Sequence, residues 1–94
     1  MGSTPAMEGK KVHTVPQFVY ILECADTSLY VGCTNNLEKR LKEHNSSKKG
    51  AHYTKIRRPV VLKYSEMLPN LSDARAREAA IKRLPREKKL ALIS

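Results

Sequence analysis

Several residue types are scarce in this chain of 94 residues, and each scarcity removes a class of protein. Trp is absent, and Phe18 is the single Phe. The longest apolar runs, such as Val60 to Leu62, fall far short of the roughly 20 residues that a membrane-spanning helix needs. The N-terminus has no apolar segment of the kind found in secretory signals. We therefore expect a cytoplasmic protein without a membrane partner.

Cysteine is also scarce. Cys24 and Cys33 are the only two, too few for the clustered ligands of a zinc site. Without an export signal, both are expected to be reduced thiols in a cytosolic protein. A single disulfide between them is the alternative.

Acidic residues are few, and the charge is therefore strongly positive. Lys and Arg total 18 against 9 Asp and Glu, a net charge of +9 with a pI near 9.8. Such a balance favours a polyanionic partner, nucleic acid first and an anionic membrane surface second, over a basic surface with no partner. Residues 39–63 alone contain nine basic residues and one acid. The nucleic-acid-binding candidates in this stretch are Lys39, Lys42, Lys48, Lys49, Lys55, Arg57 and Arg58, and a second basic cluster follows in residues 75–89.

Length and patterning predict one small domain. Residues 1–15 are rich in Gly, Ser, Thr, Pro and Lys, and we expect a flexible tail there, followed by a domain over residues 16–94. The pattern predicts strands over 18–24, 29–33 and 59–66, and helices over 37–44, 72–83 and 85–92. This order, ββαβαα, is typical of an α+β fold.

Some residues mark how these elements begin or bend. The segment Thr34-Asn35-Asn36 is expected to supply the cap of the first helix, and Ser72 that of the second, because such side chains accept hydrogen bonds from free backbone N–H groups. Gly32 inside a strand indicates either a bulge or a close approach of another group to the backbone.

The sequence contains no P-loop, dinucleotide-binding fingerprint or zinc motif, and no recognisable nucleophile elbow. Five polar residues at the ends of the predicted elements remain as catalytic candidates: Tyr20, Tyr30, Arg40, His44 and Glu78. Their types suit phosphodiester hydrolysis, which needs a cation at the phosphate, a base for water and a donor for the leaving oxygen.

Each candidate has a chemical role that suits it. Glu78 offers hard oxygens to a divalent metal, and the planar fork of Arg40 can hold a phosphate. Tyr20, Tyr30 and His44 could orient or deprotonate water.

Each also has an ordinary structural explanation. Tyrosines in strands usually pack, and arginines on helices are usually solvated. His44 near a helix C-terminus is favoured by the helix dipole, and Glu78 stands three residues after Arg75, where a surface ion pair is common.

The length of the first turn decides whether the two tyrosines can share a site. A two-residue turn at Asp26 and Thr27 would point Tyr20 and Tyr30 to opposite faces of the sheet. An odd-length loop, such as residues 26–28, would place them on the same face. A joint site therefore requires an odd loop or a bulge.

Taken in order, these motifs resemble the GIY-YIG nuclease superfamily, and the resemblance extends from about Gln17 to Leu92. The motif residues are Phe18-Val19-Tyr20, Tyr30-Val31-Gly32, then Leu37, Arg40, His44 and Glu78. Two further segments resemble short stand-alone bacterial members of that family, Leu22-Glu23-Cys24-Ala25-Asp26 and Arg57-Arg58-Pro59-Val60.

The resemblance implies a small three-stranded antiparallel sheet flanked by helices, and an endonuclease that hydrolyses DNA with one divalent metal ion. Glu78 would bind Mg²⁺ or Mn²⁺, and Arg40 would stabilise the transferring phosphate. Tyr20, Tyr30 and His44 would act on the attacking water or its hydrogen-bond network. The choice of tyrosine as base stays open.

Two departures from the family pattern bear on activity. Gly-Ile of the first motif is Phe18-Val19, and Cys33 stands where many catalytic members have Lys. The sequence also lacks an appended DNA-recognition domain, so we expect a monomer with little sequence preference, targeted by a protein partner and acting in DNA repair or processing. RNA is the other nucleic-acid substrate to consider. The alternative function is a nucleic-acid-binding module with weak or no catalysis.

Overall fold

The computed structural model describes residues 15–94, and its centre is a three-stranded antiparallel sheet. The strands are β1 (Gln17–Glu23), β2 (Leu29–Thr34) and β3 (Val61–Leu68). They lie in the order β2-β1-β3, so β1 is the central strand and β2 an edge. The predicted sheet is confirmed.

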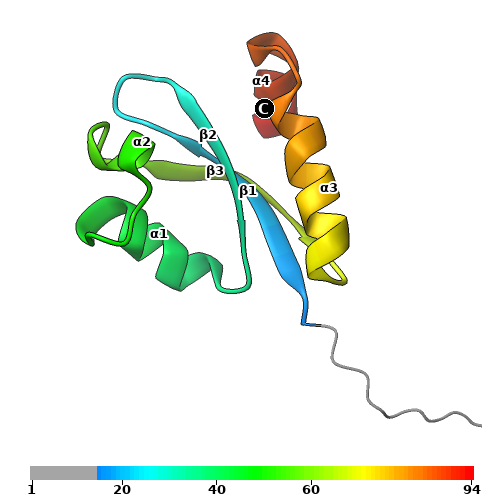
Figure 1. Cartoon of the computed structure of the whole chain (residues 1–94). Helices are drawn as coiled ribbons and strands as arrows, with labels where there is room; N and C mark the ends of the chain where they lie inside the picture. The colour runs from blue at the N-terminus through cyan, green and yellow to red at the C-terminus, as the bar shows by residue number, and fades with distance from the viewer. Residues whose placement is uncertain (1–14) are drawn as a thin grey trace, which may run out of the picture.

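Helices cover both faces of this sheet (Figure 1). Helices α1 (Leu37–Ser46) and α2 (His52–Lys55) lie on one side, whereas α3 (Leu71–Lys82) and α4 (Arg86–Ile93) lie on the other. The predicted α+β class and the order of the long elements are confirmed. No helix within residues 15–94 has the length and apolar character that crossing a membrane requires.

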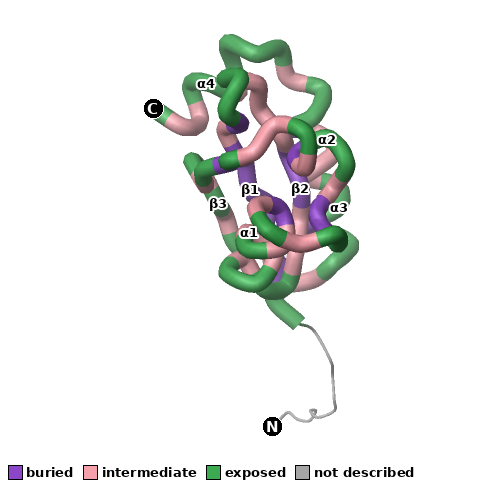
Figure 2. The backbone as a smooth tube through the Cα atoms, turned by 90° about the vertical axis from the view of Figure 1, so that its left-hand side faces the viewer, coloured by how far each residue is buried: buried purple, intermediate pink, exposed green. Residues whose placement is uncertain are grey.

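The central strand is buried on both faces, which divides the core into two parts. Val19 and Ile21 point toward α3 and pack with Ala74 and Ile81. Side chains alternate along a strand, so Tyr20 and its neighbours form the other cluster, beneath α1. Figure 2 shows the buried positions gathered along β1 and β2. A polar aromatic residue therefore lies inside the core on the α1 side.

The β1–β2 hairpin has the odd-length loop that a joint tyrosine site requires. The Cys24 N–H donates to the Ser28 carbonyl at 2.8 Å, which leaves residues 25–27 as a three-residue loop. Its last residue, Thr27, has φ 68°, the left-handed conformation that such loops use at this position. Register then places Tyr20 opposite Gly32 and Tyr30 opposite Leu22, and Tyr20, Leu22 and Tyr30 all pack in the cluster beneath α1.

The structure differs from the predicted elements in one added helix, one cap and several element ends. One turn of helix, α2, was not predicted, because four residues are too few for a helical period to be visible. Asn70, rather than Ser72, caps α3, its side chain accepting from the Asp73 N–H at 2.8 Å. β3 lies two residues later than the expected 59–66, at Val61–Leu68, and α1 ends at Ser46, two residues beyond the expected end.

The two thiols are free, as predicted. They lie on opposite faces, Cys24 in the cluster beneath α1 and Cys33 against the cluster beneath α3. The predicted flexible tail falls, apart from Val15, outside the described residues.

Candidate active site

Helix α1 positions two of the predicted residues. Its start is fixed by Asn36, the last residue of the predicted cap segment 34–36, whose side chain accepts from the Lys39 N–H at 3.1 Å. Arg40 and His44 then follow one turn apart on the same side of the helix. His44 is fully buried, whereas Arg40 keeps about a quarter of its side chain exposed.

His44 is held by a hydrogen bond at each ring nitrogen. Its Nε2 lies 2.9 Å from the Tyr20 hydroxyl, and its Nδ1 lies 2.6 Å from the Thr54 hydroxyl. Thr54 belongs to α2 and donates in turn to the Ala51 carbonyl at 2.9 Å. The central strand, α1 and α2 are thereby joined by one buried chain of polar groups.

The imidazole is neutral at physiological pH. Burial, with the positive charges of Arg40 and Arg58, lowers the pKa of His44 from 6.5 to about 4, although Glu43 opposes this shift. A neutral imidazole has one nitrogen that donates and one that accepts. The ring can therefore accept a proton from a neighbour without first losing its own.

This lowered pKa predicts a pH-dependent loss of stability. Between pH 6.5 and 4 the unfolded chain binds a proton at His44 that the folded chain does not, so stability present above pH 6.5 is lost as the pH falls. From pH 7 to pH 5 the His44 contribution amounts to about 2 kcal/mol. Urea unfolding of the wild type and His44→Gln at both pH values measures it: the variant should lose less stability by that amount. Equal losses would contradict the assignment.

Tyr20 is the tyrosine that contacts His44 through its hydroxyl. Burial raises its pKa to about 12, with Arg40 acting in the opposite direction, and the residue is 2% exposed. The hydroxyl also lies against Gly32: a Cβ added there would stand 2.5 Å from the Tyr20 oxygen. The glycine thus marks the close approach that was one of its two predicted explanations.

Tyr30 contacts His44 through its ring. The Tyr30 and His44 ring centroids are 5.2 Å apart in an edge-on arrangement, and the Tyr53 ring centroid lies 5.9 Å from that of Tyr30. The Arg57 guanidinium lies 3.8 Å above the Tyr53 ring. An aromatic row therefore leads from the buried imidazole to the surface.

Arg40 is oriented by two acceptors. Its Nη1 donates to the Glu43 carboxylate at 2.9 Å and to the Lys49 carbonyl at 2.8 Å. A guanidinium has five N–H groups, so donors remain for a phosphate. The structure thus brings Tyr20, Tyr30, Arg40 and His44 together on the α1 side of the sheet.

Glu78 lies on α3, on the other side of the sheet, and contacts none of those four residues through a hydrogen bond or ion pair. Its carboxylate pairs with Lys82 at 3.2 Å, and its side chain is 19% exposed. Burial first, and then Glu78, raise the pKa of Cys33, which places the carboxylate beside that thiol. Cys33 directly follows Gly32, so one edge strand separates Glu78 from Tyr20.

The residues present fit a divalent cation held by one carboxylate. Within the described part of the chain, no three His, Cys, Asp or Glu side chains lie close enough to form a metal cage. Mg²⁺ often takes only one or two carboxylates and completes its shell with water and substrate phosphate. Glu78 has the hard oxygens that such an ion requires.

The basic candidates divide between structural contacts and free charges. Arg58 donates to the carbonyls of Glu43, His44 and Ser47 and so closes the C-terminal end of α1. Arg57 pairs with Asp26 at 3.0 Å, and Lys39 pairs with Glu43 at the same distance.

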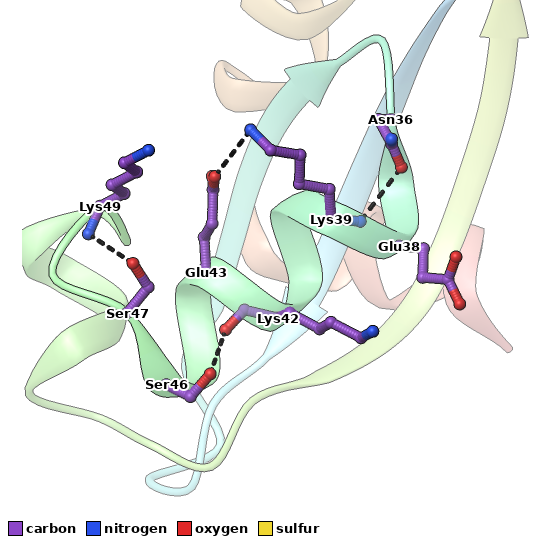
Figure 3. Close-up of a pocket in the computed structure, with 8 residues that line it drawn as sticks. All are labelled: Asn36, Glu38, Lys39, Lys42, Glu43, Ser46, Ser47 and Lys49. Atoms are coloured by element: carbon purple, nitrogen blue, oxygen red, sulfur yellow. Dashed lines mark hydrogen bonds and ion pairs between the residues drawn. The ribbon is translucent and has the colours of Figure 1, made fainter.

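A shallow cavity of about 380 Å³ follows the outer side of α1 (Figure 3). Lys42 and Lys49 line it, and neither ammonium group makes an ion pair with another described residue. This hollow, which Glu38 and Glu43 also line, is separate from the tyrosine cluster and presents ammonium groups at the surface.

The arrangement of a β-hairpin bearing two tyrosines and a helix bearing Arg and His matches a known family. The family described as GIY-YIG catalytic domain matches residues 16–91. The chain belongs to the GIY-YIG family. The predicted membership is therefore confirmed, and it places the chain in a nuclease superfamily.

Bacterial relatives agree with this assignment. A UPF0213 protein of Syntrophus aciditrophicus is 59% identical over 76 residues, which cover 81% of this chain and 87% of the relative. The UPF0213 protein CPE1444 of Clostridium perfringens is 56% identical over 77 residues, with 82% of each chain covered.

Solved structures share the fold. The NMR structure of the UPF0213 protein BH0048 from Bacillus halodurans has 41% identity and a TM-score of 0.54, over 83% of this chain and 82% of that one. The protein EF2693 from E. faecalis has 40% identity and a TM-score of 0.55, over 88% and 83% of the two chains. The names of these relatives state no activity.

Two residues of the site were not found from the sequence. Thr54 lies in the one-turn helix that periodicity could not reveal. Glu43 was counted only as the one acid in a basic stretch, although its position three residues after Arg40 could have indicated the ion pair.

Proposed function

We propose that this protein is a metal-dependent endonuclease that hydrolyses DNA phosphodiester bonds with little sequence preference. The observation that carries the proposal is the hydrogen bond of 2.9 Å between the Tyr20 hydroxyl and a neutral, buried His44. Any buried tyrosine hydroxyl needs a hydrogen-bond partner, but this partner is a neutral imidazole that can take up the phenol proton. A tyrosine that must release a proton needs such an acceptor.

In this proposal Tyr20 and His44 together act as the general base. As the attacking water gives a proton to the Tyr20 oxygen, the phenol proton moves to His44 Nε2. The water oxygen bonds to phosphorus while the bond to the leaving oxygen breaks. The leaving oxygen takes a proton from solvent, and His44 afterwards releases the proton that it gained to solvent. The products are a phosphate monoester end and a hydroxyl end. The sequence left open which tyrosine is the base; in this proposal it is Tyr20, and Tyr30 packs against the imidazole.

Arg40 would hold the phosphate during this reaction. Its guanidinium is oriented in advance by Glu43 and by the Lys49 carbonyl, so little conformational freedom is lost when DNA binds. Its positive charge stabilises the additional negative charge that develops on the phosphate oxygens.

Glu78 would hold Mg²⁺ or Mn²⁺ in this proposal. A bound divalent ion supplies Lewis-acid stabilisation of phosphate charge and lowers the pKa of water. Because Glu78 lies across edge strand β2 from Tyr20, the substrate would pass along that edge of the sheet.

Cleavage of supercoiled plasmid tests the proposal. The purified protein should nick it in Mg²⁺ or Mn²⁺, and EDTA should stop the reaction. Raising the salt concentration should weaken DNA binding steeply, because the contacts are mostly to phosphates. No nicking in either metal, at a protein concentration that binds the plasmid, would reject the nuclease.

One observation favours the alternative of a binding module. Cys33 stands beside Glu78 at the proposed metal site, and many family members have a Lys there. Under that alternative the protein shifts labelled DNA or RNA at low salt but does not cut it in any metal. Absence of binding to both would count against both functions.

A further inference from the structure

Thr54 is placed to control which nitrogen of His44 carries the proton. Its hydroxyl lies 2.9 Å from the Ala51 carbonyl, which can only accept a hydrogen bond. The single Thr54 proton therefore goes to Ala51. The Thr54 oxygen is then left to accept from His44 Nδ1, at 2.6 Å. The donor and the acceptor in each hydrogen bond from Ala51 through Thr54 and His44 therefore follow from this one carbonyl.

We propose that Thr54 is a positioning residue that holds His44 in the Nδ1–H tautomer, so that Nε2 is free to accept the proton of Tyr20. This inference rests on the proposed nuclease function and adds to it a residue from α2. The direction of transfer then runs from Tyr20 to His44, as hydrolysis requires.

The opposite tautomer would reverse the contact. Free histidine in water favours the proton on Nε2, and that nitrogen would then donate to the Tyr20 oxygen. The Tyr20 proton would have to point elsewhere, and His44 would offer no acceptor for it when the Tyr20 oxygen takes a proton from water. Thr54 thus has to overcome the intrinsic preference of the imidazole.

Burial makes this control effective. Thr54 and His44 are both 0% exposed, so water does not compete for Nδ1. The Thr54 carbonyl also accepts from the Arg57 N–H at 3.0 Å, and the Lys55 N–H bonds to the Ala51 carbonyl at 2.9 Å. The single turn of α2 therefore holds the Thr54 hydroxyl in one place.

Imidazole ¹⁵N chemical shifts at pH 7 test the tautomer directly and do not depend on activity. The wild type should show His44 protonated at Nδ1. Thr54→Val removes the hydroxyl at almost unchanged volume and should move a large share of the population to the Nε2–H form. Thr54→Ser keeps the hydroxyl and should retain the wild-type signature.

Single-turnover cleavage of labelled DNA provides the second readout. Thr54→Val should lower the rate at saturating DNA by on the order of 10- to 100-fold with unchanged DNA affinity, and Thr54→Ser should recover most of it. Ser94→Ala is the matched control, because the exposed Ser94 hydroxyl also donates to the backbone carbonyl three residues earlier, that of Ala91 at 3.1 Å. It should cleave at the wild-type rate.

Three results would overturn the proposal: an Nε2–H signature in the wild type, an unchanged signature in Thr54→Val, or equal rate losses in the Val and Ser variants. The wild-type and Thr54→Ser spectra decide the point if Thr54→Val does not fold. A wild type that shows the Nδ1–H signature but cuts no DNA would reject the nuclease function and leave the tautomer assignment in place.

Discussion

Glu78→Gln is expected to lower the rate of DNA cleavage by on the order of a thousandfold. In the proposed function Glu78 supplies the one protein carboxylate for the metal, and an amide of the same shape removes its charge. The folded state should be affected little, because the Lys82 ion pair that it breaks is half-exposed and worth less than about 1 kcal/mol. Single-turnover rates in saturating Mg²⁺ measure the effect.

Glu87→Gln is the matched control for this change. Glu87 is exposed in the first turn of α4, in the same C-terminal helical half of the chain. It should cut DNA at the wild-type rate. If Glu78→Gln also does so, the metal is held elsewhere, and the position of Glu78 across β2 reflects only its ion pair and its contact with Cys33.

Tyr20→Phe is expected to reduce cleavage by on the order of 10²- to 10⁴-fold, the range that general-base catalysis contributes. The change removes one oxygen and leaves the ring in the core, but His44 Nε2 loses its partner. An unpartnered buried acceptor costs about 1–3 kcal/mol, so the variant should also unfold at lower urea. DNA affinity should not change, because the hydroxyl is 2.9 Å from His44 and not on the basic surface.

Tyr64→Phe provides the comparison at another site. The Tyr64 hydroxyl bonds to Glu66 on β3, and its ring packs on the α3 side of the sheet. Removing that hydroxyl should leave the cleavage rate at the wild-type value. Equal rate losses in the two variants would mean that Tyr20 acts through stability alone.

The sequence predicted the part of the fold that depends on short-range patterns. The run of β-branched and aromatic residues over 18–22 predicted the central strand, and the polar segment 34–36 predicted the start of α1. The register of the hairpin depended on loop length, and two loop lengths were compatible with the residues. Only the structure could show that residues 25–27 form an odd loop and bring Tyr20 and Tyr30 to one face.

The remainder of the site depends on contacts between distant segments. Thr54 reaches His44 because the loop after α1 folds back as one turn of helix, and no periodic pattern marks four residues. The side of the sheet on which Glu78 lies is likewise set by the packing of α3 on Val19 and Ile21. The five candidates could be named from the sequence. The sequence could not show that four of them lie on the α1 side of the sheet and Glu78 on the other side.

The most direct measurement is single-turnover cleavage of labelled duplex DNA by five proteins purified alike: the wild type, Glu78→Gln, Tyr20→Phe, and the controls Glu87→Gln and Tyr64→Phe. The account predicts Mg²⁺-dependent cutting by the wild type and both controls, and loss of cutting in the other two. Equal rates in all five would identify a contaminating nuclease, and no cutting by any of them would leave only the binding module. Either result would contradict the account.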